Sequence, residues 1–262
     1  MKKSITLSSF LPMMILALGA GLAPVQGQVV NFTDPVAEEA IRDELNKASG
    51  DIKVSDLAKV ETLDISFRDI NTLSLPEGLV NLEELFLNNN NLSGTLFSPL
   101  RLPEDLESLK ILDISANKLA GTSFLAAYTT LEELNLSRNG MTKLTLPETL
   151  TNILYLDVSG NELTELNLPP GPAELLELEA GNNLMEAFTL PEGYTKLEKI
   201  VLERNNLTEL NLPSDLDSII GIELQRNDLV EIEMPEGLET LESLEIWENK
   251  LTTVTLPTDL TG

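Results

Sequence analysis

Residues 139–161 read NGMTKLTLPETLTNILYLDVSGN and contain one full period of the chain. The phrase L-x-x-L-x-L-x-x-N-x-L recurs with its asparagine at Asn90, Asn117, Asn139, Asn161, Asn183, Asn205, Asn227 and Asn249. An earlier copy has Arg68 in that position, so the steps between copies are 22 residues, then 27, then 22 six times over. A period of this length predicts a solenoid, in which each repeat packs only on its neighbours.

Each period predicts one strand followed by an extended return segment. Leu134 and Leu136 alternate with polar residues, so a strand would send both leucines into the core and Asn135 outward. At the end of the strand, a buried Asn139 carboxamide would bond backbone groups of its own and the adjacent repeat. This role is structural. The return segment repeats the alternation and ends in a Leu-Pro turn, as at Pro147.

The pattern L-x-x-L-x-L, present twice in 22 residues, resembles the short bacterial class of leucine-rich repeat (LRR) proteins with nested half-repeats. The resemblance implies a right-handed arc with a parallel concave sheet and extended convex segments. We therefore expect an α/β-type repeat solenoid dominated by β-structure, with about nine repeats over residues 60–262. The resemblance also implies a class of function, which is recognition through the concave face.

The rhythm is irregular at residues 92–130. Five residues are added between Asn90 and Asn117, in or near residues 93–101, and the next repeat lacks the Leu-Pro turn. Its run at residues 122–128 is compatible with a helical turn. Two interpretations stay open: a loop that carries contacts, and a tolerated bulge filled by Phe97 and Phe124, which we favour.

Residues 1–27 have the features of a signal peptide: Lys2 and Lys3, then 14 mostly apolar residues, then a small-residue cleavage site. The alternative, an uncleaved membrane anchor, needs about 20 apolar residues. We therefore expect no membrane insertion and an exported protein that is secreted, periplasmic or held at the cell surface. Residues 28–59 predict an N-terminal helical cap.

In this cap Asp34 and Pro35 predict a helix start, with the helix over about residues 35–47. A second short helix is expected over about residues 55–59, with Ser55 as its N-cap. A solenoid exposes the core of its first repeat, and such a cap would cover it. From Phe32 to about Ser66 the run closely resembles the N-terminal caps of bacterial exported and surface LRR proteins, including the internalin-like group.

The formal net charge is −26, from 17 basic and 43 acidic side chains. So negative a body repels nucleic acid and anionic lipid, which makes direct binding to either improbable and favours a basic protein or a divalent cation as partner. Histidine and cysteine are absent, which removes the commonest general base, the usual metal ligand and the thiol nucleophile. We expect no enzymatic activity, no cofactor and no dedicated metal site.

The outward strand positions predict the surface that meets a partner. Equivalent residues of successive repeats should stack in columns, and six of nine members of the central column are acidic: Asp64, Phe86, Asp113, Asn135, Asp157, Glu179, Val201, Glu223 and Glu245. Stacked like charges are mildly destabilising, so stability alone does not favour such a column. It indicates either a surface for a basic partner or for bridging calcium, or simply a solvated face of an acidic protein.

Exposed aromatic and basic residues complete this surface. Phe67, Phe86, Tyr155 and Trp247 should project from it, and aromatic side chains often anchor interfaces. Trp247 has an alternative role in covering the last repeat, and arginine beside acid suggests partial self-neutralisation. The predicted partner-binding set is Asp64, Phe67, Phe86, Asp113, Tyr155, Asp157, Glu179, Arg204, Glu223, Arg226, Glu245 and Trp247.

These observations predict a non-catalytic module that recognises a macromolecule, mainly a protein, through its concave face. The alternative is a structural or adhesive cell-surface module that binds polysaccharide or matrix. The array stops at Gly262 without a second polar cap. We therefore expect either self-association through this end or a longer natural product.

Overall fold

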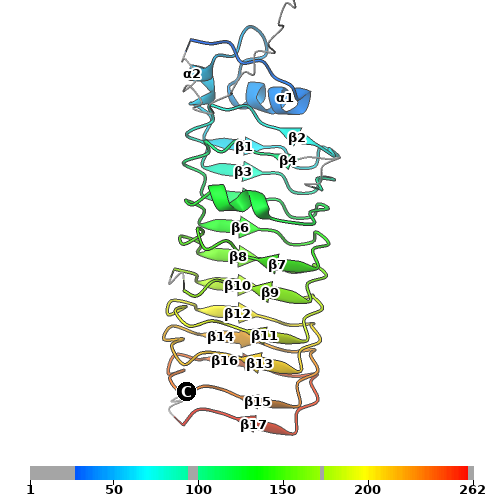
Figure 1. Ribbon diagram of the computed structural model, residues 1–262, viewed down its shortest axis with the longest axis vertical. Coiled ribbons are helices and arrows are strands. Elements are labelled where there is room, and N and C mark those ends of the chain that lie inside the picture. Colours follow the sequence, from blue (N-terminus) through cyan, green and yellow to red (C-terminus); the bar gives the residue numbers. More distant parts are fainter. Residues whose placement is uncertain (1–26, 94–99, 172–173, 259–262) are drawn as a thin grey trace, which may run out of the picture.

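The protein is an elongated stack of coils, described by a computed structural model over residues 27–93, 100–171 and 174–258 (Figure 1). One strand from each coil joins a parallel nine-stranded sheet, in the order β1 (Thr62–Asp64), β3 (Glu84–Phe86), β5 (Ile111–Asp113), β6 (Glu133–Asn135), β8 (Tyr155–Asp157), β10 (Glu177–Glu179), β12 (Lys199–Val201), β14 (Gly221–Glu223) and β16 (Ser243–Glu245). The predicted β-dominated repeat solenoid is confirmed. The predicted signal peptide lies, except for Gly27, outside the described residues.

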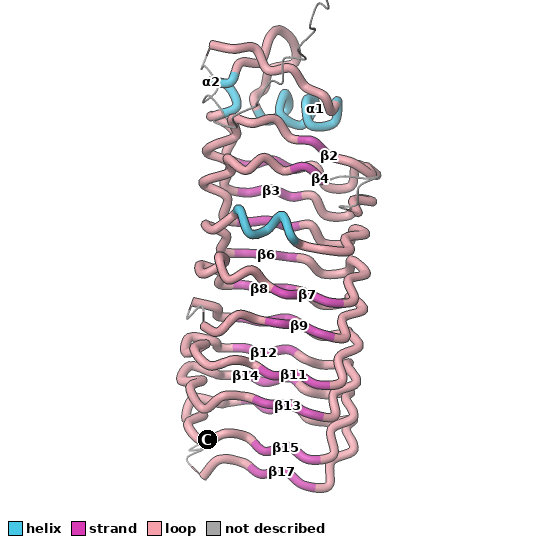
Figure 2. The backbone as a smooth tube through the Cα atoms, viewed as in Figure 1, coloured by secondary structure: helices cyan, strands magenta, loops and turns pink. Residues whose placement is uncertain are grey.

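The return segments carry further strands, which pair in twos (Figure 2). The pairs are β2 (Leu73–Ser74) with β4 (Leu100–Arg101), β7 (Lys143–Thr145) with β9 (Glu165–Asn167), β11 (Ala187–Thr189) with β13 (Glu209–Asn211), and β15 (Glu231–Glu233) with β17 (Thr253–Thr255). The prediction of extended segments here is confirmed. Their division into separate pairs was not predicted.

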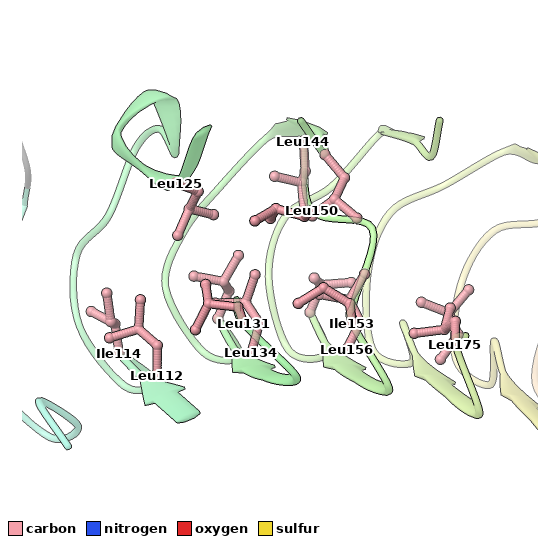
Figure 3. Packing of buried hydrophobic residues seen from close by; sticks show 14 of the residues in the cluster. Leu112, Ile114, Leu125, Leu131, Leu134, Leu144, Leu150, Ile153, Leu156 and Leu175 are labelled. Carbon is pink, nitrogen blue, oxygen red and sulfur yellow. The ribbon is translucent and has the colours of Figure 1, made fainter. Parts of the chain in front are cut away.

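Leucine and isoleucine side chains from the sheet strands and from the return segments fill the space between the two sides of the stack (Figure 3). Leu134 and Leu136 are at most 2% exposed, as the alternation predicts, and Leu144 of the return segment packs into the same core. Each coil therefore buries its apolar positions only against the coils above and below it, which is the packing of a repeat protein.

The repeated asparagines form a ladder of side-chain hydrogen bonds at the end of the nine-stranded sheet. Asn183 is 4% exposed; its Nδ2 donates to the backbone oxygens of Val158 and Ala180, and its Oδ1 accepts from the Leu163 N–H at 3.0 Å. The other ladder asparagines bond their own and the preceding coil in the same manner. The predicted structural role of these asparagines is confirmed.

The residue before the ladder position has a left-handed backbone in every coil. Its φ lies between 51° and 64° at Phe67, Asn89, Ala116, Arg138, Gly160, Asn182, Arg204, Arg226 and Glu248. Only one of these nine is glycine, although a left-handed conformation disfavours other L-residues. The hydrogen bonds of the asparagine ladder hold the backbone in this turn. The conformation is therefore set by the repeated turn and not by the type of residue at this position.

The N-terminal cap differs in detail from the prediction. Helix α1 covers Pro35–Glu44, with the Asp34 carboxylate accepting from the Val36 N–H at 2.9 Å as expected. It ends three residues earlier than predicted, because Asn46 turns left-handed at φ 50° and the Lys47 N–H bonds the Arg42 carbonyl oxygen.

The second helix of the cap, α2, covers Val54–Leu57, so it begins one residue and ends two residues earlier than predicted. Ser55 therefore lies inside the helix and is not its N-cap. The Asp56 carboxylate instead accepts from the Lys53 N–H at 3.0 Å and pairs with Lys47 and Lys59. These contacts, first the backbone bond from Lys53, hold the pKa of Asp56 well below its usual range.

The irregular region contains the expected helical turn as the 3₁₀-helix η1 at Ser123–Ala127. It takes the place of a return strand in this coil, where Leu125 is buried and Phe124 is half-buried against the core. The predicted bulge residue Phe97 lies outside the described residues, as do positions 94–99.

Two buried tyrosines predict a loss of stability at high pH. Burial, followed by the charges of Glu104 and Asp105, raises the pKa of Tyr128 to about 12, and burial raises that of Tyr194 further. Unfolded tyrosine ionises near pH 10. The unfolding free energy should therefore be unaffected by these groups below about pH 10 and fall above it, because only the unfolded state then ionises freely. Urea titrations between pH 8 and 11.5 test this prediction. The unfolding free energy of the Tyr128→Phe/Tyr194→Phe double variant should fall less over the same pH range.

Candidate partner-binding surface

Strand register aligns the predicted central column along the outward face of the nine-stranded sheet, called the sheet face below. Asp64 pairs with Phe86, Phe86 with Asp113, and the match continues without a slip to Glu223 and Glu245. The inserted residues between Asn90 and Asn117 therefore leave the column unbroken, because they are taken up outside the strands.

A depression of about 400 Å³ lies in the middle of the sheet face. Five predicted site residues line it: Phe86, Asp113, Tyr155, Asp157 and Glu179. Glu133, Asn135 and Glu177 line it as well and were not in the predicted set. They occupy the central column and the column before it, so the same stacking argument, applied to every outward position, would have included them.

The depression combines aromatic and acidic groups. Tyr155 is 42% exposed and Phe86 is half-buried, so both rings offer apolar area to an incoming group. The carboxylates of Asp113, Asp157 and Glu179 lie in the same depression. Burial, together with the neighbouring Asp157 and Glu177 charges, raises the pKa of Glu179 despite the opposing effect of Lys199.

The aspartates of the central column also shape their own strand ends. Asp113 accepts from the Ser115 N–H at 2.8 Å, and Asp157 accepts from the Ser159 N–H at 2.8 Å. Asp64 does the same with Ser66. These bonds to the residue two positions on are turn-forming, so the short acids have a local structural role beside any role in binding.

Lys199 neutralises part of the column farther along the sheet face. Its Nζ lies 3.1 Å from Glu177, 3.7 Å from Glu179 and 3.5 Å from Glu223. Burial lowers the pKa of Lys199, but the hydrogen bond and charges of these glutamates outweigh it and raise the pKa overall. The expected self-neutralisation is therefore present, through a lysine and not only through the predicted arginines.

Trp247 belongs to a separate cluster at the end of the sheet face. Its indole N–H donates to Glu245 at 3.0 Å, and the Arg226 guanidinium carbon lies 4.9 Å from the ring centre. Arg226 also pairs with Glu248 at 2.9 Å. The ring remains 47% exposed. Three predicted residues thus contact one another here, away from the central depression.

The other two predicted residues lie apart. Phe67, 73% exposed, borders another depression with Asp69 and Ala116 near the N-terminal coils. Arg204 lies 3.9 Å from Glu203. The twelve predicted residues therefore form several groups along the sheet face, and the central depression gathers five of them.

Within residues 27–93, 100–171 and 174–258, no group of three or more acidic side chains is arranged to hold a metal ion. In the same part of the chain, no helix is long and apolar enough to cross a membrane.

The stacked coils, the asparagine ladder and the single parallel sheet define a leucine-rich repeat solenoid. A family model described as the BspA type leucine-rich repeat region matches residues 115–219 and 162–262 in 6 copies, and a second leucine-rich repeat model matches residues 81–102. The chain belongs to the BspA-type leucine-rich repeat family. A comparison with curated proteins gives no match.

Solved structures share this architecture. Internalin C2 from Listeria monocytogenes has a TM-score of 0.59 and 19% identity over 84% of this chain and 87% of its own. The leucine-rich effector protein YopM from Yersinia pestis has a TM-score of 0.57 and 26% identity over 86% of this chain, and this chain covers 62% of YopM. The leucine-rich repeat domain of APL1B has a TM-score of 0.59 and 20% identity over 86% of this chain and 76% of its own. The likeness to internalin C2 and APL1B shows a shared fold.

Proposed function

We propose that this protein is an exported, non-catalytic module that binds a protein partner on its sheet face, centred on the depression lined by Phe86 and Tyr155. One observation carries the proposal: exposed aromatic area and several carboxylates meet in one concave site on the sheet face. Aromatic residues with surrounding polar groups are typical of the energetic centre of protein interfaces. Proteins of repeat architecture use such extended surfaces for recognition.

The partner is expected to present a basic surface. Acids outnumber bases by 43 to 17 in the chain, and no basic residue lines the depression. A lysine or arginine of the partner placed over either ring would meet a π-face and the carboxylates beside it.

Removing the aromatic rings should abolish partner capture. The Phe86→Ala/Tyr155→Ala variant is expected to lose at least about tenfold in affinity, because truncating interface hot spots costs on the order of 2 kcal/mol or more. The test is affinity capture from the native surroundings, followed by titration of the captured partner. The matched control is Leu184→Ala, which removes an apolar side chain of similar exposure, 46%, located outside the depression. Unchanged affinity in the double variant, with the fold intact, rules out this site.

The salt dependence of binding distinguishes recognition of a basic protein from the alternative function, adhesion to polysaccharide or matrix. Screening should weaken a charge-complementary complex, so the affinity is expected to fall several-fold between 50 and 500 mM NaCl, roughly as the Debye length shortens. Binding to a glycan array that persists at 500 mM salt favours instead an adhesive module that holds polysaccharide or matrix.

Self-association through the last coils is a further part of the proposal. Leu244, Ile246 and Leu251 are only partly buried, and Val254 and Leu256 are 40% and 49% exposed. A second copy packed on this edge would cover them. Light scattering of the exported form tests it, and a monomer at high micromolar concentration contradicts it.

A further inference from the structure

We propose that the side of the molecule opposite the sheet face holds a second peptide-binding groove, between β13 and β15, which accepts an extended basic segment as an added β-strand. The groove has a volume of about 620 Å³ and is lined by residues of β13, β15, β17 and the turn after β15. It is separate from the central depression and does not depend on binding there, although it shares Leu256 with the edge proposed above for self-association.

Unpaired strand edges flank the groove. β13 pairs with β11 and β15 pairs with β17, whereas no ladder joins β13 to β15 in the described part of the chain. Figure 2 shows these two pairs as separate steps of the stack. A strand edge without a partner presents backbone N–H and C=O groups to any extended chain that fits beside it.

The core side chains are uncovered where the groove opens. The inward residues of the earlier return segments are almost fully buried; Phe188 and Leu190, for example, are 2% and 3% exposed. The equivalent residues in the next return segment are Leu210 in β13 and Leu212 directly after β13. Both are only partly buried, and both line the groove. An added strand would cover them with every second side chain, because alternate side chains of a strand point to one face.

The negative charge of the groove favours a basic peptide. Glu209, Glu231, Glu233 and Glu236 line it, and no lysine or arginine is among the lining residues, all of which lie in the described part. The side chains of an added strand that point away from the core would lie beside these glutamates. The matching peptide therefore alternates apolar and basic residues. A second copy of this chain fits less well, because a body with a net charge of −26 is repelled from an acidic groove.

The probe is a dye-labelled peptide, acetyl-Lys-Val-Lys-Val-Lys-Val-Lys-amide, titrated with the full chain by fluorescence anisotropy. The Glu231→Lys/Glu233→Lys variant should weaken binding at least tenfold. Glu186→Lys, an exposed site just before the paired strand β11, should change it less than twofold. A peptide of the same sequence with N-methylated valines should also bind at least tenfold more weakly, because it loses the backbone donors along one edge of the added strand and carries methyl groups there instead.

Circular dichroism and urea titration establish that each variant is folded. Equal affinities for the methylated and unmethylated peptides would overturn the proposal, since purely electrostatic binding does not need backbone donors. The Glu186→Lys/Glu148→Lys variant reverses two charges outside the groove. If it weakens peptide binding as much as the groove variant does, the proposal is overturned as well. The Phe86→Ala/Tyr155→Ala variant should bind the probe normally, so a failure of the sheet-face proposal is distinguishable from a failure of this one.

Discussion

Replacing Asn183 by alanine is expected to lower the free energy of unfolding by about 3 kcal/mol, because the change removes several buried hydrogen bonds and leaves one buried donor without its acceptor. The Leu163 N–H loses its acceptor, and the oxygens of Val158 and Ala180 each lose one of two side-chain donors, keeping those of Asn161 and Asn205. No water reaches this site easily, since the side chain is 4% exposed. Urea denaturation followed by circular dichroism measures the change.

Asn167→Ala is the matched control for this prediction. Asn167 is an exposed asparagine of β9 whose side chain bonds only Glu165 and Thr145. Its replacement should change the unfolding free energy by no more than about 0.5 kcal/mol. Similar losses in the two variants would mean that the ladder does not stabilise the stack as described.

Gly193→Ala is expected to destabilise the stack by about 2–4 kcal/mol through a clash between backbones. A Cβ at this position would lie 2.8 Å from the Cα atom of Gly171 in the preceding coil, and Gly193 has φ +100°. Neither the contacting backbone nor the left-handed conformation accommodates a methyl group without movement of the coils.

Gly121→Ala is the control, since nothing lies within 4 Å of its added Cβ. The unfolding free energy of this variant should lie within about 0.5 kcal/mol of that of the unsubstituted chain. If Gly193→Ala is equally harmless, the two turns are not packed as closely as the structure places them.

The repeat pattern was sufficient to predict the main sheet and its register. Leucines such as Leu134 and asparagines such as Asn161 recur at a fixed step, and a one-residue slip would turn each leucine to the solvent. The burial of these positions therefore followed from the sequence alone. The central column was predicted in its register, but Val201 in that column is buried, with 6% exposure, and most other members are half-buried.

Backbone details of the turns were not predictable in the same way. The left-handed residue before each ladder position is phenylalanine, alanine or arginine in different coils, as at Phe67, Ala116 and Arg204. No residue preference marks it, because the hydrogen bonds of the adjacent coils impose the conformation. Pairing of the return strands also depends on the spacing between coils, which the period does not specify.

The candidate surface could be predicted as columns but not as clusters. Tyr155 and Phe86 belong to different columns and line the same depression, although β5 and β6 lie between their strands. Lys199 reaches three glutamates only through its side-chain conformation. The sequence therefore identified the residues that face outward, while the structure was needed to show that Lys199 pairs with Glu177 and Glu179, two of the acids that line the depression.

Site-specific photo-crosslinking tests the central proposal most directly. A benzophenone amino acid is placed at position 155 in one sample and at position 184 in another, and each is irradiated with the captured partner. We predict a covalent adduct from position 155 and little or none from position 184, which lies outside the depression. A partner that is captured but crosslinks from position 184 and not from position 155 would contradict binding at the sheet face.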